Sequence, residues 1–408
     1  MAPPRHVIVA GAGIAGLTAA LALVRAGLRV TVLERAEELE ETGAGIQLAP
    51  NAMHVLDALG LRERLRAAAT ASQAIRVMAG RSAREILRIP LGVRAEWRYG
   101  APFLTIHRAD LQATLADAAR AEHNIALKLG VEVTHFTVHD AGIVTVLGRR
   151  GRQMIEERGL ALIGADGVWS ALRQRLSRQQ PPRPAHRTAW RALLPSGGIP
   201  DEFRAPLVHL WLGQDSHLVL YPVKGGALLN MVAIVEEDWN EPGWSAPGER
   251  NALLRHFARW TWADEVRDLL AMPRQWLKWA LYENSGASPR GDGPATLIGD
   301  AAHPILPFLA QGAGLAIEDA AVLAAMLGKN SDNPAAALRR YEAARRARVA
   351  RVQNASRRQG RIYGMTGPEA LVRNFAIQAM GGEKLLSRYD WLYSWRAPQF
   401  AEALSRSS

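Results

Sequence analysis

Apolar residues in the first part of the chain fall into two short runs separated by glycines. Residues 7–10 are all apolar and end at a glycine-rich break over 11–16, which predicts a buried strand followed by a tight turn. Residues 14–26 are mostly apolar, contain no proline and precede Gly27, as expected of a helix that a glycine ends. The β-branched run 28–33 predicts a second strand, so the order is strand, turn, helix, strand.

A similar mixture of helix and strand patterns continues to about residue 180. Asn51 is a candidate N-cap of a helix that ends near residue 59, and Asp110 is a candidate N-cap of a helix that ends near residue 122. Short strands with glycine turns are expected between residues 73 and 106. Further sheet strands are expected over 131–136, 143–147 and 160–163.

The pattern changes after the proline-rich stretch 181–184. Alternating apolar and polar residues then predict strands of an antiparallel sheet, over 208–212, 218–223 and 228–235. The earlier pattern returns with a strand and turn over 295–300 and an alanine-rich helix over 314–327. The rest of the chain is expected to be helical and contains an aromatic run over 389–395.

These patterns predict an α/β protein with a doubly wound, Rossmann-like domain, an inserted antiparallel-sheet domain and C-terminal helices. The doubly wound domain is discontinuous and is expected to comprise residues 1–72, 101–180 and 290–365. Residues 73–100 and 181–289 are assigned to the inserted domain, and 366–408 to a C-terminal helical segment.

The uncharged stretch 7–24 also has to be weighed as a membrane segment or a signal peptide. A spanning helix needs about 20 predominantly apolar residues, and this stretch is interrupted by glycine-turn chemistry and followed by Arg25 and Arg29. No small-residue cleavage site follows it. The sequence therefore favours a chain without stable membrane association.

Composition narrows the chemistry further. The 408 residues include no cysteine, which excludes disulfides, thiolate metal sites and a cysteine nucleophile; we expect no metal and favour a cytoplasmic location. A net charge of +11 favours anionic partners. The densest basic stretch, 339–361, carries apolar residues at helical spacing and is predicted to be the solvated face of an amphipathic helix. Because no recognisable nucleic-acid-binding motif accompanies this stretch, nucleic acid is not an expected partner.

The first glycine turn has the spacing of a dinucleotide site. Gly11 suits the tight turn, Gly13 lets a pyrophosphate approach the backbone, and Gly16 lets helix and strand pack closely. The helix N-terminus offers unpaired N–H donors to the phosphates. Glu34 follows at about the distance at which such a unit places an acid on a ribose hydroxyl.

Two more glycine–acid turns, at 164–167 and 299–300, suggest one long cofactor that three loops touch. Through these motifs the chain resembles the class A FAD-dependent aromatic hydroxylases, which have the para-hydroxybenzoate-hydroxylase fold. The residues that carry the resemblance are 11–16 with Glu34, 164–173 and 298–304. Within this family the chain is similar to 3-hydroxybenzoate 6-hydroxylases and salicylate hydroxylases, through 311–314, 317–319 and the Tyr-Asp-Trp-Leu-Tyr run from Tyr389.

The resemblance implies FAD as cofactor, NADH or NADPH as transient co-substrate, O2, and a small aromatic acid as substrate. It implies hydride transfer to FAD, formation of a C4a-hydroperoxide and transfer of OH to a phenolate. The implied cofactor-binding residues are Gly11, Gly13, Ala15, Gly16, Glu34, Arg35, Gln47, Arg108, Val133, Asp166, Asp300, Gly312, Ala313 and Gly314.

Several of these residues have specific implied roles. Glu34 would bind the ribose of the AMP half, with Arg35 beside it, and Val133 would meet the adenine. Arg108 would contact the flavin side, Gln47 would lie near the isoalloxazine, and Asp300 would hold the ribityl chain. Asp166 belongs to a turn associated with FAD and the nicotinamide cofactor. From the residues alone, a helix that begins near 312–314 can stabilise negative charge on the flavin pyrimidine edge. Asp300 could instead cap its turn, and His303 is expected to be structural.

Hydroxylation of a phenol also needs a group that removes the phenolic proton. His217 and Tyr221 are four residues apart on a predicted strand, so they share one face. The resemblance to 3-hydroxybenzoate 6-hydroxylases places a His and a Tyr at these two positions, as catalytic residues. His209 competes for the role of base, and a structural histidine is an alternative for each. Arg191 is a candidate clamp for the substrate carboxylate, or else a structural arginine.

The position of attack stays open at this point. His217 and Tyr221 favour ring hydroxylation of a 3-hydroxybenzoate-like acid, which is our preferred interpretation. Pro307 and Phe308, predicted substrate contacts, favour a decarboxylating hydroxylase of salicylate or 6-hydroxynicotinate. A flavin epoxidase or reductase of the same fold that acts on a lipid or polyketide is a further possibility, as is a non-enzymatic nucleotide-binding regulator such as the GDI proteins. The sequence leaves a homodimer open.

Overall fold

The computed structural model describes residues 5–39, 44–139, 142–176, 182–239, 245–258, 262–284, 291–329, 332–397 and 400. Several predicted domain limits, at 180, 181, 289 and 290, and the last eight residues of the predicted C-terminal segment lie outside these ranges. Among the described residues, none of the helices has the length and apolar character that a membrane crossing requires.

A five-stranded parallel sheet forms the base of the structure, in the order β19, β12, β1, β2, β8. Its strands are β1 (His6–Ala10), β2 (Arg29–Glu34), β8 (Ile125–Leu129), β12 (Ala161–Gly164) and β19 (Ala295–Leu297). The apolar run 7–10 is buried because both faces of this sheet are covered. Val7 and Val9 pack in a core with helices on one face, and Ile8 and Ala10 pack in a second core with a small three-stranded antiparallel sheet, described below, on the other. Strands from three distant parts of the chain therefore end at one edge of the sheet, as the predicted doubly wound fold requires.

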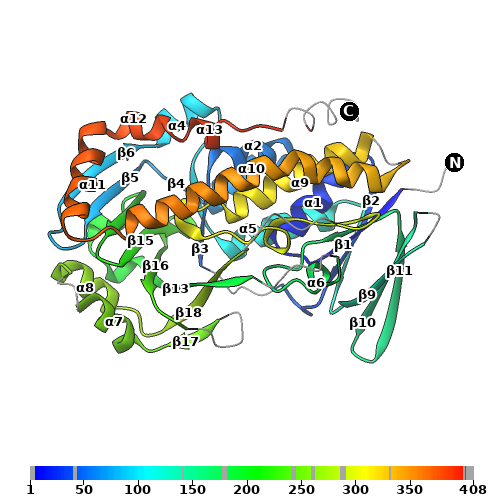
Figure 1. Cartoon of the computed structure of the whole chain (residues 1–408), viewed down its shortest axis with the longest axis horizontal. Helices are drawn as coiled ribbons and strands as arrows, with labels where there is room; N and C mark the ends of the chain where they lie inside the picture. Colours follow the sequence, from blue (N-terminus) through cyan, green and yellow to red (C-terminus); the bar gives the residue numbers. More distant parts are fainter. Residues whose placement is uncertain are drawn as a thin grey trace.

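Several helices belong to this part of the structure. They are α1 (Ile14–Arg25), α2 (Pro50–Ala58), α3 (Arg62–Ala68), α5 (Arg108–Ala121), α6 (Ala171–Leu176), α9 (Gly312–Lys329) and α10 (Pro334–Tyr363). The alanine-rich helices α1 and α9 pack against each other, since small side chains let the helices approach closely. Figure 1 shows that α10 runs along α9 towards the opposite end of the molecule.

A second, eight-stranded sheet lies at that end, in the order β17, β18, β13, β16, β15, β14, β5, β6. Its strands are β5 (Ala74–Ala79), β6 (Glu85–Pro90), β13 (Arg183–Pro195), β14 (Leu207–Leu212), β15 (Ser216–Val223), β16 (Leu228–Glu236), β17 (Ala246–Gly248) and β18 (Trp276–Glu283). Neighbouring strands are antiparallel except β14 and β5, which are parallel. This sheet joins residues from both segments assigned to the inserted domain; the division of the chain into domains stays a prediction.

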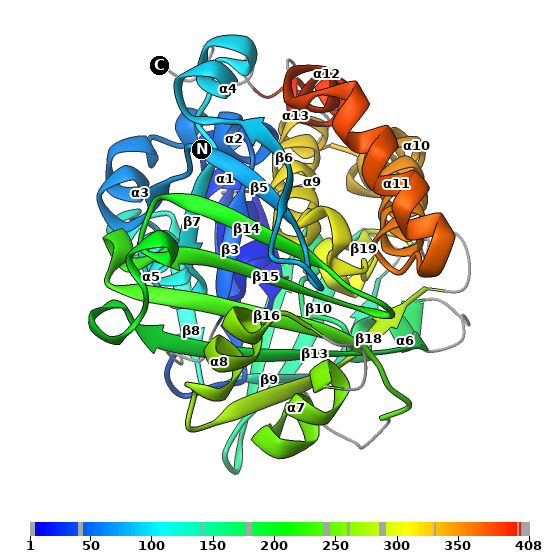
Figure 2. The same cartoon turned by 90° about the vertical axis from the view of Figure 1, so that its left-hand side faces the viewer.

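The two faces of the eight-stranded sheet have different neighbours. Helices α7 (Arg250–Ala258) and α8 (Asp264–Ala271) cover one face through a tryptophan-rich core that includes Trp190 and Trp276. The C-terminal helices α11 (Gly367–Met380) and α12 (Gly382–Ser387) pack beside β6, as Figure 2 shows. The other face is turned towards the parallel sheet.

Two small sheets and two short helices complete the structure. One sheet contains β3 (Gly45–Leu48), β7 (Leu104–His107) and β4 (Thr70–Ala71), and the other contains β11 (Gln153–Gly159), β10 (Val144–Arg150) and β9 (Glu132–Val138). The helices are α4 (Gly92–Tyr99) and α13 (Asp390–Tyr393). Helix α4 lies where only short strands were expected, and it buries just Ala95 and Tyr99, too sparse a pattern to stand out in the sequence.

Both predicted helix caps are wrong. Helix α2 begins at Pro50 and is preceded by Ala49, and Asn51 is buried inside the first turn, where its side chain bonds to other buried groups. Helix α5 is preceded by His107, and Asp110 lies in its first turn, 3.2 Å from the Lys224 Nζ atom. In each case the side chain contacts residues far away in the sequence and does not cap the helix, and the local sequence does not reveal such contacts.

Candidate functional site

A cavity of about 1240 Å³ lies between the two large sheets. On one side it is lined by the turns that follow β1, β12 and β19, at the carboxyl edge of the parallel sheet, where ligands bind in folds of this type. On the other side, alternate residues of β13, β14, β15 and β16 point into it. The following predicted cofactor residues line the cavity: Gly13, Ala15, Gln47, Arg108, Asp300, Gly312 and Ala313.

The first glycine turn has the geometry that a pyrophosphate needs. Gly11 has φ +109°, and a Cβ atom there would lie 2.4 Å from the Ala165 carbonyl oxygen. A Cβ atom on Gly16 would lie 1.9 Å from the Gly11 carbonyl oxygen. Gly13, in contrast, has no neighbouring heavy atom within 4 Å of such a Cβ, and it directly precedes α1. The turn is closed by packing, whereas the helix N-terminus faces open space that suits the phosphates of FAD.

Glu34, at the end of β2, is bound to this turn. Its carboxylate accepts hydrogen bonds from the backbone N–H of Ala12, at 2.7 Å, and of Ala36, at 2.9 Å. The side chain of the adjacent Arg35 is exposed. Glu34 therefore holds the loop that would carry the cofactor, and its contact with a ribose hydroxyl stays a prediction.

Replacing Glu34 with Ala is expected to weaken FAD binding by about 0.5–3 kcal/mol, because a hydrogen bond to a charged acceptor is lost. The dissociation constant is measured by fluorescence titration of the apoprotein with FAD. Glu38→Ala serves as the matched control, since Glu38 is an exposed acid in the same loop. An unchanged dissociation constant in the Glu34 variant would contradict the assignment.

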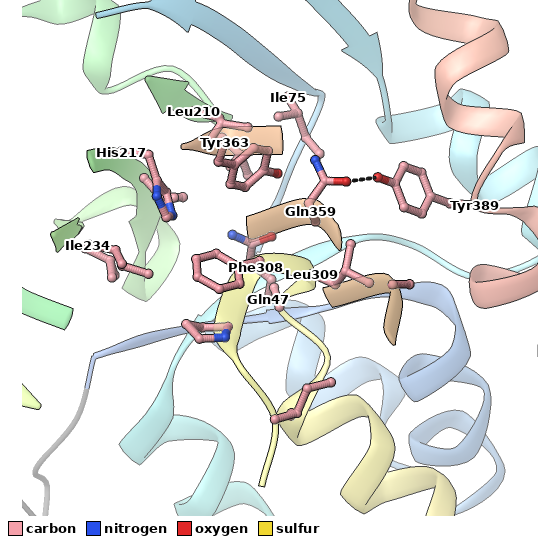
Figure 3. Close-up of a pocket in the computed structure, with 18 of the residues that line it drawn as sticks. Gln47, Ile75, Leu210, His217, Ile234, Phe308, Leu309, Gln359, Tyr363 and Tyr389 are labelled. Atoms are coloured by element: carbon pink, nitrogen blue, oxygen red, sulfur yellow. Dashed lines mark hydrogen bonds between the residues drawn. The ribbon is translucent and has the colours of Figure 1, made fainter. Parts of the chain in front are cut away.

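The predicted flavin side of the cavity contains two half-buried side chains of opposite charge, Asp300 and Arg108. Burial raises the pKa of Asp300, although His303 and Arg108 oppose this shift. Burial lowers the pKa of Arg108, and Asp300 opposes that. Gln47, on β3, also lines this part of the cavity (Figure 3). These side chains can bind the polar ribityl chain and the polar edge of a flavin.

Other predicted cofactor residues are not part of the cavity lining. Gly11, Gly16, Glu34 and Arg35 are described above, and Val133, on β9, packs with Leu33 and Val146 in a separate core. Asp166 accepts a hydrogen bond from the Leu172 N–H at 3.2 Å, and its other oxygen is buried without a partner among the described residues. A Cβ atom on Gly314 would lie 2.9 Å from the Gln311 side-chain oxygen, so a larger residue there would displace the Gln311 amide.

All of the predicted catalytic and substrate residues line the cavity, namely His217, Tyr221, Arg191, Pro307 and Phe308. His217 and Tyr221 lie on the same face of β15, as their spacing predicts, and both are buried. The His217 ring is 5.6 Å from the Phe308 ring and 5.1 Å from the Tyr363 ring. Figure 3 shows these three rings around one space.

The surroundings of this space keep both candidate catalytic side chains, His217 and Tyr221, uncharged. Burial lowers the pKa of His217 to about 3, and the Arg187 guanidinium adds to the shift. Burial raises the pKa of the Tyr221 hydroxyl, and Arg191 opposes this. His217 is therefore a neutral imidazole at neutral pH and can accept a proton, whereas Tyr221 keeps its own.

Arg191, on β13, is a half-buried cation that makes no ion pair with a carboxylate among the described residues. Its guanidinium carbon lies 5.0 Å from the centre of the Trp279 ring, and its Nε atom is buried with no hydrogen-bond partner in the part of the chain that the structure describes. Burial lowers its pKa, and the charge of Arg108 acts in the same direction. A guanidinium in a cavity with its Nε atom buried and no carboxylate partner favours binding of an anion such as a carboxylate.

His209 lies on the wrong face to compete with His217. Val208, Leu210 and Leu212 of β14 point into the cavity, so the intervening His209 points to the opposite face of the sheet. Its ring is 5.2 Å from that of Phe203. The structure therefore excludes His209 as the base in this cavity.

Sequence reasoning missed the part of the cavity wall that α10 and the segment after it supply, which includes Gln359, Tyr363 and Tyr389. The Tyr389 hydroxyl donates a hydrogen bond to the Gln359 side-chain oxygen at 3.0 Å, and Tyr363 lies nearby (Figure 3). The tyrosines of the aromatic run 389–395 were the only local signal. No sequence motif marks Gln359 or Tyr363, because they line the cavity only as a result of where α10 ends in the fold.

Comparisons with known proteins identify the family of this chain. The chain matches the FAD binding domain family over residues 5–356. It is 37% identical to 3-hydroxybenzoate 6-hydroxylase 1 of Aquipseudomonas alcaligenes, over 95% of this chain and 97% of that protein. It is also 37% identical to the 3-amino-4-hydroxybenzoate 2-monooxygenase PtnB3 of Streptomyces platensis, over 96% of both.

Solved structures of similar fold include a hydroxylase and an FAD complex. A salicylate hydroxylase substrate complex superposes with a TM-score of 0.80 and 27% identity, and the match covers 98% of each chain. Klebsiella pneumoniae HpxO, complexed with FAD and uric acid, superposes with a TM-score of 0.81 and 26% identity, over 98% of this chain and 97% of that one.

Proposed function

Since this chain belongs to the FAD binding domain family, as a class A aromatic hydroxylase, we propose that it hydroxylates a small phenolic acid with NADH or NADPH and O2. The observation that carries the proposal is that one cavity contains both the neutral His217 and Arg191, a cation that has no carboxylate partner in the described ranges. FAD, when bound and reduced by the nicotinamide cofactor, supplies the activated oxygen. A phenolic acid has the proton that His217 can accept and the carboxylate that Arg191 can bind.

Each side chain then has a distinct task. His217 accepts the phenolic proton, which raises the electron density of the ring, and Tyr221 donates a hydrogen bond to the phenolate oxygen. The Phe308 and Tyr363 rings, 6.4 Å apart and nearly perpendicular, hold the substrate ring beside His217 and exclude water. Arg191 orients the ring through its carboxylate.

The cofactor residues divide along the length of FAD. The start of α1 at Gly13 faces the pyrophosphate, with Gly11 and Gly16 shaping the turn. Asp300 faces the ribityl chain, and the N–H groups of Gly312 and Ala313, at the start of α9, face the pyrimidine edge of the flavin. Glu34, Arg35, Val133 and Asp166 serve the parts of the cofactor outside the cavity.

A lipid substrate or a purely regulatory role fits this cavity less well. A polyene or other lipid offers neither a phenolic proton nor a carboxylate, so a flavin epoxidase or reductase leaves His217 and Arg191 without tasks. A nucleotide-binding regulator needs no substrate cavity beside its cofactor. Substrate-stimulated oxidation of NADH separates the hydroxylase from both of these functions.

The expected product carries its new hydroxyl para to the existing one and retains its carboxylate. We expect 3-hydroxybenzoate to stimulate NAD(P)H oxidation most strongly in a panel of hydroxybenzoates and hydroxypyridine acids, with the product identified by mass spectrometry. Pro307 and Phe308 line the cavity next to His217, so they contact the ring in either branch of the reaction. Stoichiometric CO2 from salicylate or 6-hydroxynicotinate, without turnover of 3-hydroxybenzoate, would reverse this choice.

A further inference from the structure

Two consecutive acids on α9, Glu318 and Asp319, are fully buried and have no task in the chemistry described above. Arg345 of α10 donates from Nη2 to Glu318 at 2.8 Å and from Nε to Asp319 at 2.6 Å. Arg348 donates a second charged hydrogen bond to Glu318 at 2.7 Å. Removing these four charged side chains from water costs free energy, and apolar side chains in their place would not carry this cost. The cluster therefore has a role other than stabilising the fold.

Asp319 is bound to the turn that presents Asp300. Its Oδ2 atom accepts the Gly299 N–H at 2.9 Å and lies 2.5 Å from His303 Nε2. Burial would raise the pKa of Asp319, but His303 and Arg345 hold it at about 2. Burial would likewise lower the pKa of His303, yet Asp319 raises it, so the two form a buried ion pair. Both ends of the turn 299–303 are thus attached to one carboxylate.

Glu318 is connected to a different loop. The Asn51 side-chain amide donates to Glu318 at 2.7 Å and to the Gln311 side-chain oxygen at 2.9 Å. Gln311 is buried and directly precedes Gly312, the first residue of α9. The loop before it includes Ala310 in the left-handed region, with φ +52°. Glu318 therefore holds the start of α9 in place through Asn51 and Gln311.

From these contacts we infer that Glu318 and Asp319 are positioning residues with separate tasks; the inference rests on the FAD site proposed above. Asp319 sets the turn whose Asp300 faces the ribityl chain, and so it controls how tightly FAD is held. Glu318, through Asn51, sets the N–H groups that face the flavin pyrimidine edge, and so it controls how strongly reduced flavin is favoured. Supporting groups of this kind commonly set the geometry and electrostatics of the groups they bind.

Two substitutions test the separation of these tasks. Asp319→Asn is expected to raise the FAD dissociation constant about 10- to 100-fold, the effect that loss of such supporting contacts has at metal sites. Asn51→Ala is expected to change that constant by less than about threefold, but to weaken the preference for reduced over oxidised flavin about tenfold, which lowers the two-electron midpoint potential by about 30 mV. Binding is measured by fluorescence titration and the potential by spectroelectrochemistry.

The controls keep this result interpretable. Asp57→Asn removes a half-buried acid of α2 that pairs with Arg62, and it should change neither quantity. If Asp319→Asn does not fold, His303→Asn removes the same turn contact while Asp319 keeps Arg345, and a smaller loss of FAD affinity is expected. Folded variants in which affinity and potential change together, or neither changes, overturn the inference. A wild-type protein that binds no FAD refutes the proposed function instead.

Discussion

The His217→Ala variant is expected to form hydroxylated product roughly 10²- to 10⁴-fold more slowly than the wild-type protein, because it lacks the general base. Burial lowers the pKa of this imidazole to about 3, so it is neutral at neutral pH. A phenolate that forms beside it favours the protonated ring, so proton transfer from the substrate becomes easier. Product formation under saturating FAD, NADH and O2 is the quantity to measure.

FAD binding should be nearly unchanged in this variant, since His217 lies on the sheet opposite the cofactor turns. Tyr221→Phe should slow product formation in the same direction, because it loses the hydrogen bond to the phenolate. His209→Ala is the matched control, as His209 is a buried histidine on the other face of the same sheet. A normal rate in the His217 variant together with a slow His209 variant would show that the base is wrongly assigned.

The Arg191→Met variant is expected to lose about 2–5 kcal/mol of the free energy that binds the substrate, the usual cost of removing one partner of a buried charge pair. The loss should appear mainly as a higher KM for the phenolic acid. Arg191→Lys should rescue little, because the guanidinium stacks on Trp279 and can bind a carboxylate through two N–H groups.

An analogue without the carboxylate makes this test specific. The wild-type enzyme should bind the unsubstituted phenol as weakly as the Arg191 variant binds the acid, and the substitution should not weaken phenol binding further. Arg250→Met, in the outer helix α7, serves as a control for a general loss of positive charge. If the acid and the phenol lose affinity equally, Arg191 is structural and the clamp lies elsewhere.

Much of the candidate site is predictable from the sequence because its features are local. The turn over 11–16 depends on glycines whose steric tolerance does not change with the surroundings. The spacing of His217 and Tyr221 places them on one face of any strand. These local rules, with the order of the motifs along the chain, are enough for the family and the fold class, both of which are confirmed.

Other assignments depend on which residues meet across the fold. Nothing in the local pattern says which face of the antiparallel sheet is turned to the cofactor, so His209 and His217 are equivalent candidates until the sheet is placed. Tyr363 approaches His217, and Gln359 and Tyr389 line the same cavity, only because α10 spans the molecule and the chain then returns beside β6. Contacts between residues far apart in the chain cannot be read from the pattern of a single sequence.

The sequence by itself determined the class of protein and the cofactor, because glycine turns and strand periodicity follow from backbone geometry alone. Only the tertiary structure decided which polar side chains are buried. Asn51 resembles a cap and Arg345 resembles one charge of a solvated helix face, yet both are buried. The reason is that Glu318 and Asp319, supplied by another helix, provide the hydrogen bonds and charges without which neither side chain could leave water.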